Sequence, residues 1–264
     1  MDREILLRLL DSAREIARAA GRAILEIAVD DAGTTTKEDG TPLTRADMAS
    51  HTAIEAGLAP LEPKLPVLSE EGDLQAICTG DWGTYWCVDP LDGTKEFVKG
   101  LTDYTVNIAL VLSGRPILGV IDIPAVGVTY WAARGMGAWK CRHDGEPERI
   151  APSRCERPAS AVVSRSHLDA ETERFLEGLG ITEVVRHGSS LKICAVADGA
   201  ADIYPRFGPT CLWDTAAGAA IAIEAGCDVI DLTGKPLSYD PGGGIKHAGF
   251  VVKPAGLEVF LGPG

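Results

Sequence analysis

The sequence lacks any long apolar run. No stretch approaches the ~20 apolar residues of a transmembrane helix. The chain opens Met1-Asp2-Arg3-Glu4, and a charged opening differs from the apolar core of a secretory signal, so we expect none. These features predict a cytoplasmic protein without a transmembrane segment, and they leave association with the inner membrane surface open.

Basic residues are too few to balance the acidic ones. Lys and Arg number 25 against 38 Asp and Glu, giving a net charge of −13. That balance argues against electrostatic binding to a nucleic acid polymer or an anionic membrane. It also means that an anionic substrate would need a local positive charge, which a bound metal ion can supply.

Several cysteine and catalytic motifs are missing. There is no Cys-x-x-Cys pair, and the seven cysteines are an odd number, so we expect reduced core thiols in a cytosolic protein. There is also no Gly-x-x-x-x-Gly-Lys-[Ser/Thr] loop, His-Glu-x-x-His site or Gly-x-Ser-x-Gly elbow. These absences speak against nucleoside triphosphatases, zinc proteases of that type and serine hydrolases of that type. The cysteines are residues 78, 87, 141, 155, 194, 211 and 227.

The 264 residues divide at a segment rich in turn residues, 143–158. Before it, strand-like runs follow one another at the spacing of an antiparallel meander. After it, strands and helices alternate, which is typical of an α/β layer. We therefore expect an α/β fold with two lobes, residues 1–150 and 151–264. The expected helices are 2–29, 44–58, 168–178, 189–198 and 213–225, and the expected strands are 34–43 (a hairpin), 66–69, 85–88, 104–112, 116–123, 127–132, 137–141, 159–164, 182–187, 201–205, 227–231 and 248–252.

The stretch that organises the chain is Val88-Asp89-Pro90-Leu91-Asp92-Gly93-Thr94. Asp89 and Asp92 should project where the strand 85–88 ends and the backbone turns. Two carboxylates ~4 Å apart repel by roughly 4 kcal/mol at an effective dielectric constant of about 20. Mg²⁺ with oxygen ligands removes that cost, although an ordinary solvated turn fits the same residue types.

Further carboxylates lie at the ends of predicted elements. Glu70 and Glu71 follow the strand 66–69, and Asp47 and Asp214 lie in the first turns of two helices. Asp47 could simply complete a capping box with Thr44, Asp214 could favour the helix dipole, and the glutamates could be solvated. Ligand sites of layered α/β folds are nonetheless usually found at such strand ends.

Taken together, three segments resemble the signature of the inositol monophosphatase superfamily of metal-dependent, lithium-sensitive phosphatases. They are Ser69-Glu70-Glu71, Asp89-Pro90-Leu91-Asp92-Gly93-Thr94 and Trp213-Asp214-x-Ala-Ala-Gly, and the resemblance runs over nearly the whole chain. Within the superfamily the chain is most similar to bacterial 3′(2′),5′-bisphosphate nucleotidases of sulfur assimilation. Lys95-Glu96 replaces the Thr-Asn usual in inositol phosphatases, and the segment 246–250 departs from the common Asn-Pro form. Further matching segments are Lys95-Glu96-Phe97, Thr105–Leu110, Pro116–Val120, Ser164–His167, Gly188–Lys192 and Tyr204–Thr210.

The resemblance implies a layered αβαβα sugar-phosphatase-like fold with a metal site between the lobes. It implies two Mg²⁺ ions, with a weaker third site near Glu70. Asp89 would bridge the first two ions, Thr94 would orient the attacking water, and Asp47 would receive its proton. The implied metal ligands are Glu70, Asp89, the carbonyl of Leu91, Asp92 and Asp214.

The resemblance also implies substrate contacts. His167 and Ser189 would flank the adenosine, while Lys192 and Arg206 would meet the phosphate that is not cleaved. Alternatively, Ser189 could be a helix N-cap, Arg206 a surface ion pair and His167 the flank of a helix. The backbone amides of Gly93 and Thr94 would hold phosphate oxygens. The other substrate-binding residues implied near the metal ions are Glu70, Leu91, Asp92 and Asp214.

The implied activity is Mg²⁺-dependent removal of the 3′(2′)-phosphate of adenosine 3′(2′),5′-bisphosphate to give AMP and phosphate. One alternative is hydrolysis of inositol-1-phosphate or fructose-1,6-bisphosphate on the same scaffold. A non-catalytic metal- or nucleotide-binding module is a third interpretation, which the pairing of Thr94 with Asp47 disfavours. The oligomeric state is left open.

Overall fold

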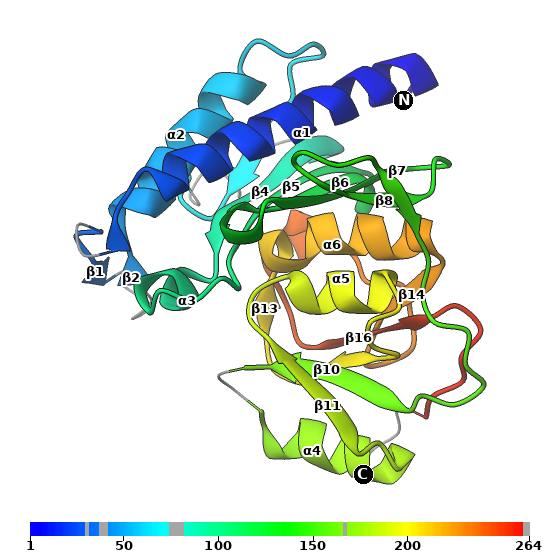
Figure 1. The fold of residues 1–264 in the computed structure, drawn as a ribbon. Coiled ribbons are helices and arrows are strands. Elements are labelled where there is room, and N and C mark those ends of the chain that lie inside the picture. The colour runs from blue at the N-terminus through cyan, green and yellow to red at the C-terminus, as the bar shows by residue number, and fades with distance from the viewer. Residues whose placement is uncertain (30–31, 37–41, 74–81, 166–167, 261–264) are drawn as a thin grey trace.

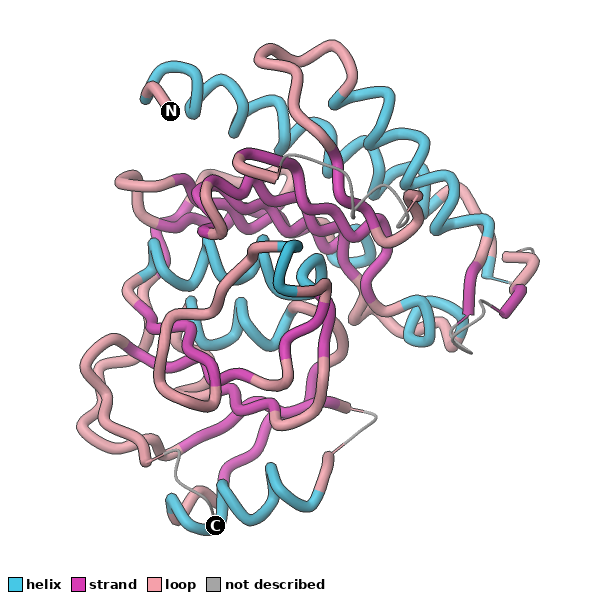
Figure 2. Tube along the Cα trace, turned by 180° about the vertical axis from the view of Figure 1, so that it is seen from behind, coloured by secondary structure: helices cyan, strands magenta, loops and turns pink. Residues whose placement is uncertain are grey.

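The computed structural model describes residues 1–29, 32–36, 42–73, 82–165 and 168–260. Helices and sheets alternate in five layers (Figure 1). Two long helices cover one face of a large sheet, and two further helices cover its other face. Small sheets follow beneath, and α4 (Ala170–Leu179) closes the far end; the view from behind shows the same order (Figure 2). The expectation of a layered α/β fold is confirmed.

The first layer consists of α1 (Arg3–Leu25) and α2 (Arg45–Leu58). The apolar stripe of α1 is buried, including Leu9 and Ala13, and it packs on α2 and on the sheet. Thr44 is the N-cap of α2, as its sequence predicts, and Asp2 is the N-cap of α1. Between them, β1 (Thr35–Thr36) pairs antiparallel with β2 (Pro42–Leu43), as expected of the hairpin.

The large sheet has seven strands in the order of the chain, β3 to β9. Only β3 and β4 run parallel, so β4 to β9 form the predicted antiparallel meander. The strands are β3 (Val67–Ser69), β4 (Thr84–Asp92), β5 (Thr105–Leu112), β6 (Arg115–Ile123), β7 (Val128–Ala133), β8 (Ala138–Arg142) and β9 (Glu148–Ile150). The sequence did not indicate β9, because it lies inside the turn-rich segment.

The strand 85–88 is expected to end before Asp89, but β4 continues to Asp92. Asp89 pairs with Asn107 and Asp92 with Thr105, so β4 carries one extra residue at this point. Pro90 cannot donate to the ladder, and its carbonyl accepts the Ser50 hydroxyl at 2.6 Å. Residues three apart face opposite sides of a regular strand, and a bulge of one residue lets them share a side.

The rest of the chain forms the next three layers. Helix α6 is almost wholly buried and packs on β4 to β7. Close approach depends on Gly119 of β6, since a Cβ there would lie 2.2 Å from the Ala217 carbonyl oxygen. The remaining elements are α3 (Thr94–Val98), β10 (Ser160–Ser164), α4 (Ala170–Leu179), β11 (Glu183–His187), α5 (Leu191–Ala197), β12 (Tyr204–Arg206), β13 (Thr210–Cys211), α6 (Leu212–Ala225), β14 (Cys227–Asp231), β15 (Lys246–His247), β16 (Phe250–Pro254) and the 3₁₀ turns Pro124–Val126 and Pro241–Gly243.

Three small sheets, β10-β11, β12-β16-β14 and β13-β15, lie in this second part. The short α3, β13 and β15 carried no periodic signal and were not expected. We propose that residues 1–150 form an N-terminal lobe and residues 151–264 a C-terminal lobe, since the seven-stranded sheet ends at Ile150. We use these two names below.

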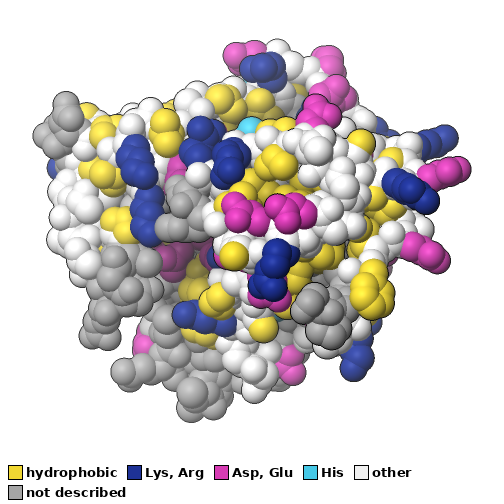
Figure 3. Space-filling view, turned by 90° about the horizontal axis from the view of Figure 1, so that it is seen from below, with side chains coloured by type: hydrophobic (Ala, Val, Ile, Leu, Met, Phe, Trp, Pro, Cys, Tyr) yellow, Lys and Arg dark blue, Asp and Glu magenta, His cyan; other side chains and the backbone are white. Residues whose placement is uncertain are grey.

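Two further expectations concern the thiols and the membrane. All six cysteines among the described residues are free, and Cys78 lies outside those residues. Among the helices that the structure describes, none is both long and apolar enough to cross a lipid bilayer. On the described part of one face, acidic and basic side chains are interspersed (Figure 3).

Candidate active site

Three carboxylates from distant parts of the chain meet at one point. Oxygens of Glu70, Asp89 and Asp214 all lie within 4.8 Å of one another. Glu70 follows β3, Asp89 lies on β4, and Asp214 lies in the first turn of α6. The first two come from the N-terminal lobe and the third from the C-terminal lobe. The predicted convergence of these acidic residues is therefore present in the structure.

The cluster is electrostatically unfavourable without a counter-charge. Asp89 is 1% exposed, and burial together with repulsion from Glu70, Asp92 and Asp214 raises its pKa. Burial and repulsion from Asp214 and Glu70 raise the pKa of Asp92 to about 7, although Lys192 and the Ser190 N–H oppose the rise. All the donors are hard oxygen atoms, which suits a divalent cation such as Mg²⁺. The residues present therefore fit the metal that the resemblance implies.

Hydrogen bonds fix the directions of these carboxylates. Asp92 Oδ2 accepts the Ser190 N–H at 2.7 Å and the Asn107 side-chain amide at 3.4 Å. Asp214 Oδ2 accepts the Thr210 hydroxyl at 2.5 Å and the Cys211 N–H at 2.9 Å. In both residues, these hydrogen bonds from the described part of the chain occupy Oδ2, so that Oδ1 can take another ligand.

Thr94 and Asp47 are in contact. The Thr94 hydroxyl lies 2.9 Å from Asp47 Oδ1 and 3.2 Å from the Leu91 carbonyl oxygen. Asp47 Oδ2 accepts the Thr44 N–H at 2.7 Å and the Thr44 hydroxyl at 2.6 Å. Asp47 therefore completes the capping box of α2 and also holds Thr94. The local interpretation and the catalytic one are compatible.

Gly93 precedes Thr94 in a backbone conformation that favours glycine, with φ of 97°. A Cβ at this position would lie 2.9 Å from the Asp103 carbonyl oxygen. Both constraints explain why this turn requires glycine.

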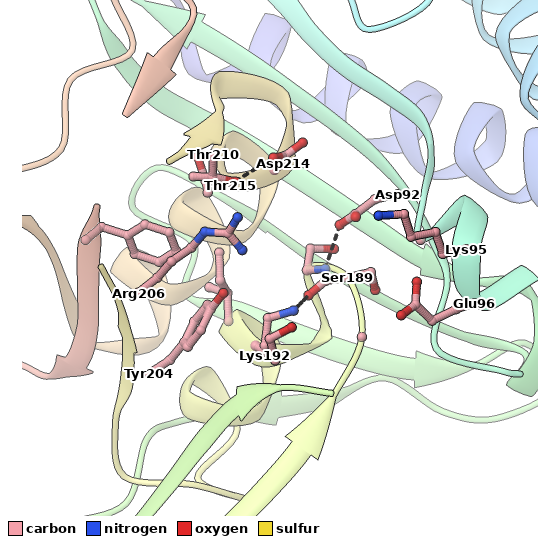
Figure 4. Close-up of a pocket in the computed structure, with 16 residues that line it drawn as sticks. Asp92, Lys95, Glu96, Ser189, Lys192, Tyr204, Arg206, Thr210, Asp214 and Thr215 are labelled. Carbon is pink, nitrogen blue, oxygen red and sulfur yellow. Dashed lines mark hydrogen bonds between the residues drawn. The ribbon is translucent and has the colours of Figure 1, made fainter. Parts of the chain in front are cut away.

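Beside the acidic cluster lies a pocket of about 190 Å³ (Figure 4). It is lined from both lobes, and Lys192 and Arg206 face the space between Asp92, Asp214 and Tyr204. Lys192 Nζ donates to the Ser189 carbonyl and lies 5.6 Å from the centre of the Tyr204 ring. The pocket thus has an acidic end and a basic end. Its lining residues are Asp92, Gly93, Lys95, Glu96, Ser164, Gly188, Ser189, Ser190, Lys192, Ile193, Tyr204, Arg206, Thr210, Asp214, Thr215 and Phe250.

The second-lobe predictions can now be located. Ser189, Lys192 and Arg206 line the pocket, whereas His167 lies outside the described residues. The N-cap of α5 is Ser190 and not Ser189. Arg206 donates to the carbonyls of Gly208 and Pro209, at 3.3 and 2.8 Å, and so it is held by the backbone.

Some residues of the site were not assigned from the sequence. Lys95, Glu96, Tyr204 and Thr210 line the pocket, and each belongs to a segment that carries the resemblance. Asn107, which contacts Asp92, was not assigned either. Its signal in the sequence is that it is a polar residue in an otherwise apolar strand, and in the structure it pairs with Asp89.

The chain matches the model of the inositol monophosphatase family over residues 6–257. A 3′(2′),5′-bisphosphate nucleotidase CysQ from Shigella flexneri is 47% identical over 246 residues, covering 92% of this chain and 99% of that protein. The protein of the same name from Escherichia coli K12 is 48% identical over 246 residues, with the same two coverages of 92% and 99%.

A solved structure shows the same fold. The crystal structure of CysQ from Bacteroides thetaiotaomicron matches with a TM-score of 0.82 and 41% identity, covering 94% of this chain and 97% of that one. It is described as a bacterial member of the inositol monophosphatase family. The match over residues 6–257, the identity to these relatives and the shared fold agree. The chain belongs to the inositol monophosphatase family.

Proposed function

We propose that the protein is a Mg²⁺-dependent 3′(2′),5′-bisphosphate nucleotidase, which hydrolyses adenosine 3′(2′),5′-bisphosphate to AMP and phosphate. The observation that carries this proposal is the meeting of Glu70, Asp89 and Asp214 beside the Thr94–Asp47 pair. The similarity to nucleotidases over 92% of the chain supports the choice of substrate.

The ligand set that we propose for the metal is Glu70, Asp89, the Leu91 carbonyl, Asp92 and Asp214. When bound between these oxygens, Mg²⁺ would stabilise the charge that develops on the phosphoryl group and acidify the attacking water. The protein holds these carboxylates close together despite their mutual repulsion. It does so by burying them and by fixing Asp92 and Asp214 with hydrogen bonds from Ser190 and Thr210.

Thr94 and Asp47 would handle the proton of the attacking water. The Thr94 hydroxyl donates toward Asp47 Oδ1 at 2.9 Å, so its oxygen can accept a hydrogen bond from a water. As the water oxygen bonds to phosphorus, the bond from phosphorus to the ester oxygen of the nucleotide breaks. The proton of the attacking water passes to Thr94 Oγ1, and the Thr94 proton passes to Asp47 Oδ1. The ester oxygen that leaves takes up a proton from a solvent water, so that AMP is released with a free hydroxyl. A well-placed proton acceptor of this kind typically contributes a factor of about 10² to 10⁴.

The basic end of the pocket would bind the phosphate that is not cleaved. Arg206 offers a planar guanidinium group that can bind two phosphate oxygens at once, and Lys192 adds a point charge. Ser189 and Tyr204 line the same pocket, where the nucleoside would lie. Inositol-1-phosphate has no second phosphate and would leave both cations without a partner.

Two further properties belong to this proposal. The six free cysteines of the described residues fit a reducing compartment, such as the cytoplasm. Inhibition by Li⁺ and a place in sulfur assimilation are expected through the resemblance to the nucleotidases.

The proposal is tested by measuring phosphate release from adenosine 3′,5′-bisphosphate, inositol-1-phosphate and fructose-1,6-bisphosphate in parallel with Mg²⁺. We expect kcat/KM for the nucleotide to exceed that for inositol-1-phosphate by about 10- to 100-fold, because a hydrogen bond to a charged group is typically worth about 1.5–3 kcal/mol. Fructose-1,6-bisphosphate carries a second phosphate but no nucleoside, and its kcat/KM should also be lower than that of the nucleotide. Equal or higher kcat/KM for either sugar phosphate would assign the enzyme to the sibling activity. No release from any of them would remove the phosphatase interpretation.

A further inference from the structure

A three-residue strap, Gly188–Ser190, connects the C-terminal lobe to the N-terminal lobe at the edge of the pocket. The Gly188 N–H donates to Asp103 Oδ2 at 2.9 Å. The Ser190 N–H donates to Asp92 Oδ2 at 2.7 Å. Both ends of the strap are therefore tied by backbone donors to carboxylates of the other lobe.

Asp103 is a built anchor for one end of this strap. The residue is 8% exposed, and its Oδ2 also accepts a 2.6 Å bond from Arg165 and lies 3.5 Å from His187 Nδ1. These donors hold the pKa of Asp103 below its usual value against the effect of burial. Gly188 makes the close approach possible, because a Cβ there would lie 2.8 Å from the Asp103 carbonyl oxygen.

The middle of the strap presents groups to the pocket. Ser189 has a φ of 41°, a region that residues other than glycine rarely occupy and that is often found at ligand sites. Its hydroxyl is buried and has no hydrogen-bond partner among the described residues, and its carbonyl accepts a hydrogen bond from Lys192 Nζ. The strap thus fixes the positions of Ser189 and Lys192 together.

The two ends of the strap differ in how many anchors they have. The Ser190 hydroxyl lies 2.8 Å from Thr105 Oγ1 and 2.9 Å from Asn107 Oδ1. That end stays attached without Asp103. For the Gly188 end, the structure shows only the bond to Asp103 among the side chains of the N-terminal lobe that it describes.

We propose that Asp103 is a positioning residue that, through the strap, holds Ser189 and Lys192 where a substrate with two phosphates requires them. Asp103 does not line the pocket, so it acts through Gly188 and not by touching the substrate. This inference rests on the proposed function, because it assigns Lys192 to the phosphate that is not cleaved.

Asp103→Asn is the informative variant, since it keeps the size of the side chain and removes the charge that Gly188 and Arg165 share. Loss of a contact made equally in the ground state and the transition state raises KM and leaves kcat. We expect KM for adenosine 3′,5′-bisphosphate to rise about tenfold, the factor for one charge-assisted hydrogen bond. kcat should change less than about threefold, because the Ser190 end keeps Asp92 in place.

The comparison substrate is adenosine 3′-monophosphate, which lacks the second phosphate. Its KM should rise less than that for the bisphosphate in Asp103→Asn, since a contact of Ser189 to the nucleoside is common to both substrates and the contact of Lys192 to the second phosphate is not. The matched control is Asp202→Asn. Asp202 is also 8% exposed and also anchors backbone, accepting the N–H groups of Ala159 and Ser160 at 2.8 and 2.9 Å, but it does not line the pocket.

A larger rise in KM for the bisphosphate than for the monophosphate, in Asp103→Asn and not in Asp202→Asn, supports the inference. Equal changes for both substrates, or the same change in the control, would overturn it and leave the proposed function standing. If the unaltered protein does not hydrolyse the bisphosphate, the proposed function fails and the inference fails with it. If Asp103→Asn does not fold, KM for the two substrates is measured for Arg165→Gln in its place. The Arg165 side chain is 40% exposed, so that the protein should tolerate its replacement, and it donates to the same oxygen of Asp103.

Discussion

The hydroxyl of Thr94 lies 2.9 Å from Oδ1 of Asp47, a residue 47 positions earlier in the chain. This contact joins the first turn of α3 to the first turn of α2, and Asp47 Oδ2 is already occupied by Thr44. Asp47 therefore has one oxygen for the helix cap and one for Thr94. We expect the two roles to separate on mutation.

Thr94→Val should lower kcat for the bisphosphate by about 10² to 10³ and change KM little, because it removes only the group that carries the proton. Thr94→Ser keeps the hydroxyl and should retain most of kcat. Asp47→Asn combined with Thr94→Val should be little worse than Thr94→Val alone, since residues that act as a unit are not additive. Steady-state kinetics of the four proteins test this, and a kcat for Thr94→Val close to that of the unaltered protein would rule out the proton path.

Most mutations of buried residues lower the stability of a protein, but Asp89→Asn should raise the stability of the metal-free protein. Without metal, the variant should unfold at a higher temperature than the unaltered protein, because it removes a buried charge that Glu70, Asp92 and Asp214 repel. Saturating Mg²⁺ should raise the melting temperature of the unaltered protein, because a ligand at a concentration of 100 times its Kd stabilises the folded state by about 2.7 kcal/mol. It should leave that of the variant nearly unchanged. Calorimetry of both proteins with Mg²⁺ and with chelator measures the two differences; an equal Mg²⁺ response in both would show that Asp89 is not a ligand.

The metal-free protein should lose stability as the pH rises. The pKa of Asp92 is raised from 3.8 to about 7 in the folded state, so between these values the folded protein binds more protons than the unfolded chain. The contribution of Asp92 to stability then falls with increasing pH and levels off above about pH 7. Urea denaturation in chelator at about pH 5 and pH 8 should show a lower free energy of unfolding at the higher pH, with a smaller difference in Asp92→Asn. A free energy that increases over this interval in the unaltered protein would mean that Asp92 is not held neutral.

Lys192→Met should reduce kcat/KM for adenosine 3′,5′-bisphosphate by about 10- to 100-fold, the usual value of a hydrogen bond to a charged group. Methionine keeps most of the volume of this buried side chain. The loss for adenosine 3′-monophosphate should be less than about threefold. Lys253→Met is the control, since Lys253 is also buried, at 7% exposed, but pairs with Asp228 at 2.7 Å and does not line the pocket. Similar losses of kcat/KM on both substrates would show that Lys192 does not bind the phosphate that is not cleaved.

Most of the elements could be predicted from periodicity, because each is a local property. The buried stripe of α1 repeats at helical spacing, and the strands of the meander are separated by turn residues. The exceptions are short or interrupted. The strand β9 lies among turn residues, and the bulge at Pro90 let β4 continue where a proline and two aspartates indicated its end.

The site could be predicted only in part, for a different reason. Glu70, Asp89 and Asp214 lie in segments that match the family signature, and the structure brings them together. Asp103 carries no such signal, since its partners Arg165 and Gly188 lie 62 and 85 positions further along the chain. Contacts across two lobes depend on tertiary packing, which local spacing does not encode.

The central claim is that acidic side chains of both lobes gather a metal ion for phosphate ester hydrolysis. The most direct test is phosphate release from adenosine 3′,5′-bisphosphate by the purified protein in Mg²⁺, after chelation, and after Mg²⁺ is restored, with Asp89→Asn in parallel. We predict that activity is lost on chelation and recovered on restoration, and that the variant is inactive throughout. Undiminished release in chelator, or a fully active Asp89→Asn protein, would contradict the account.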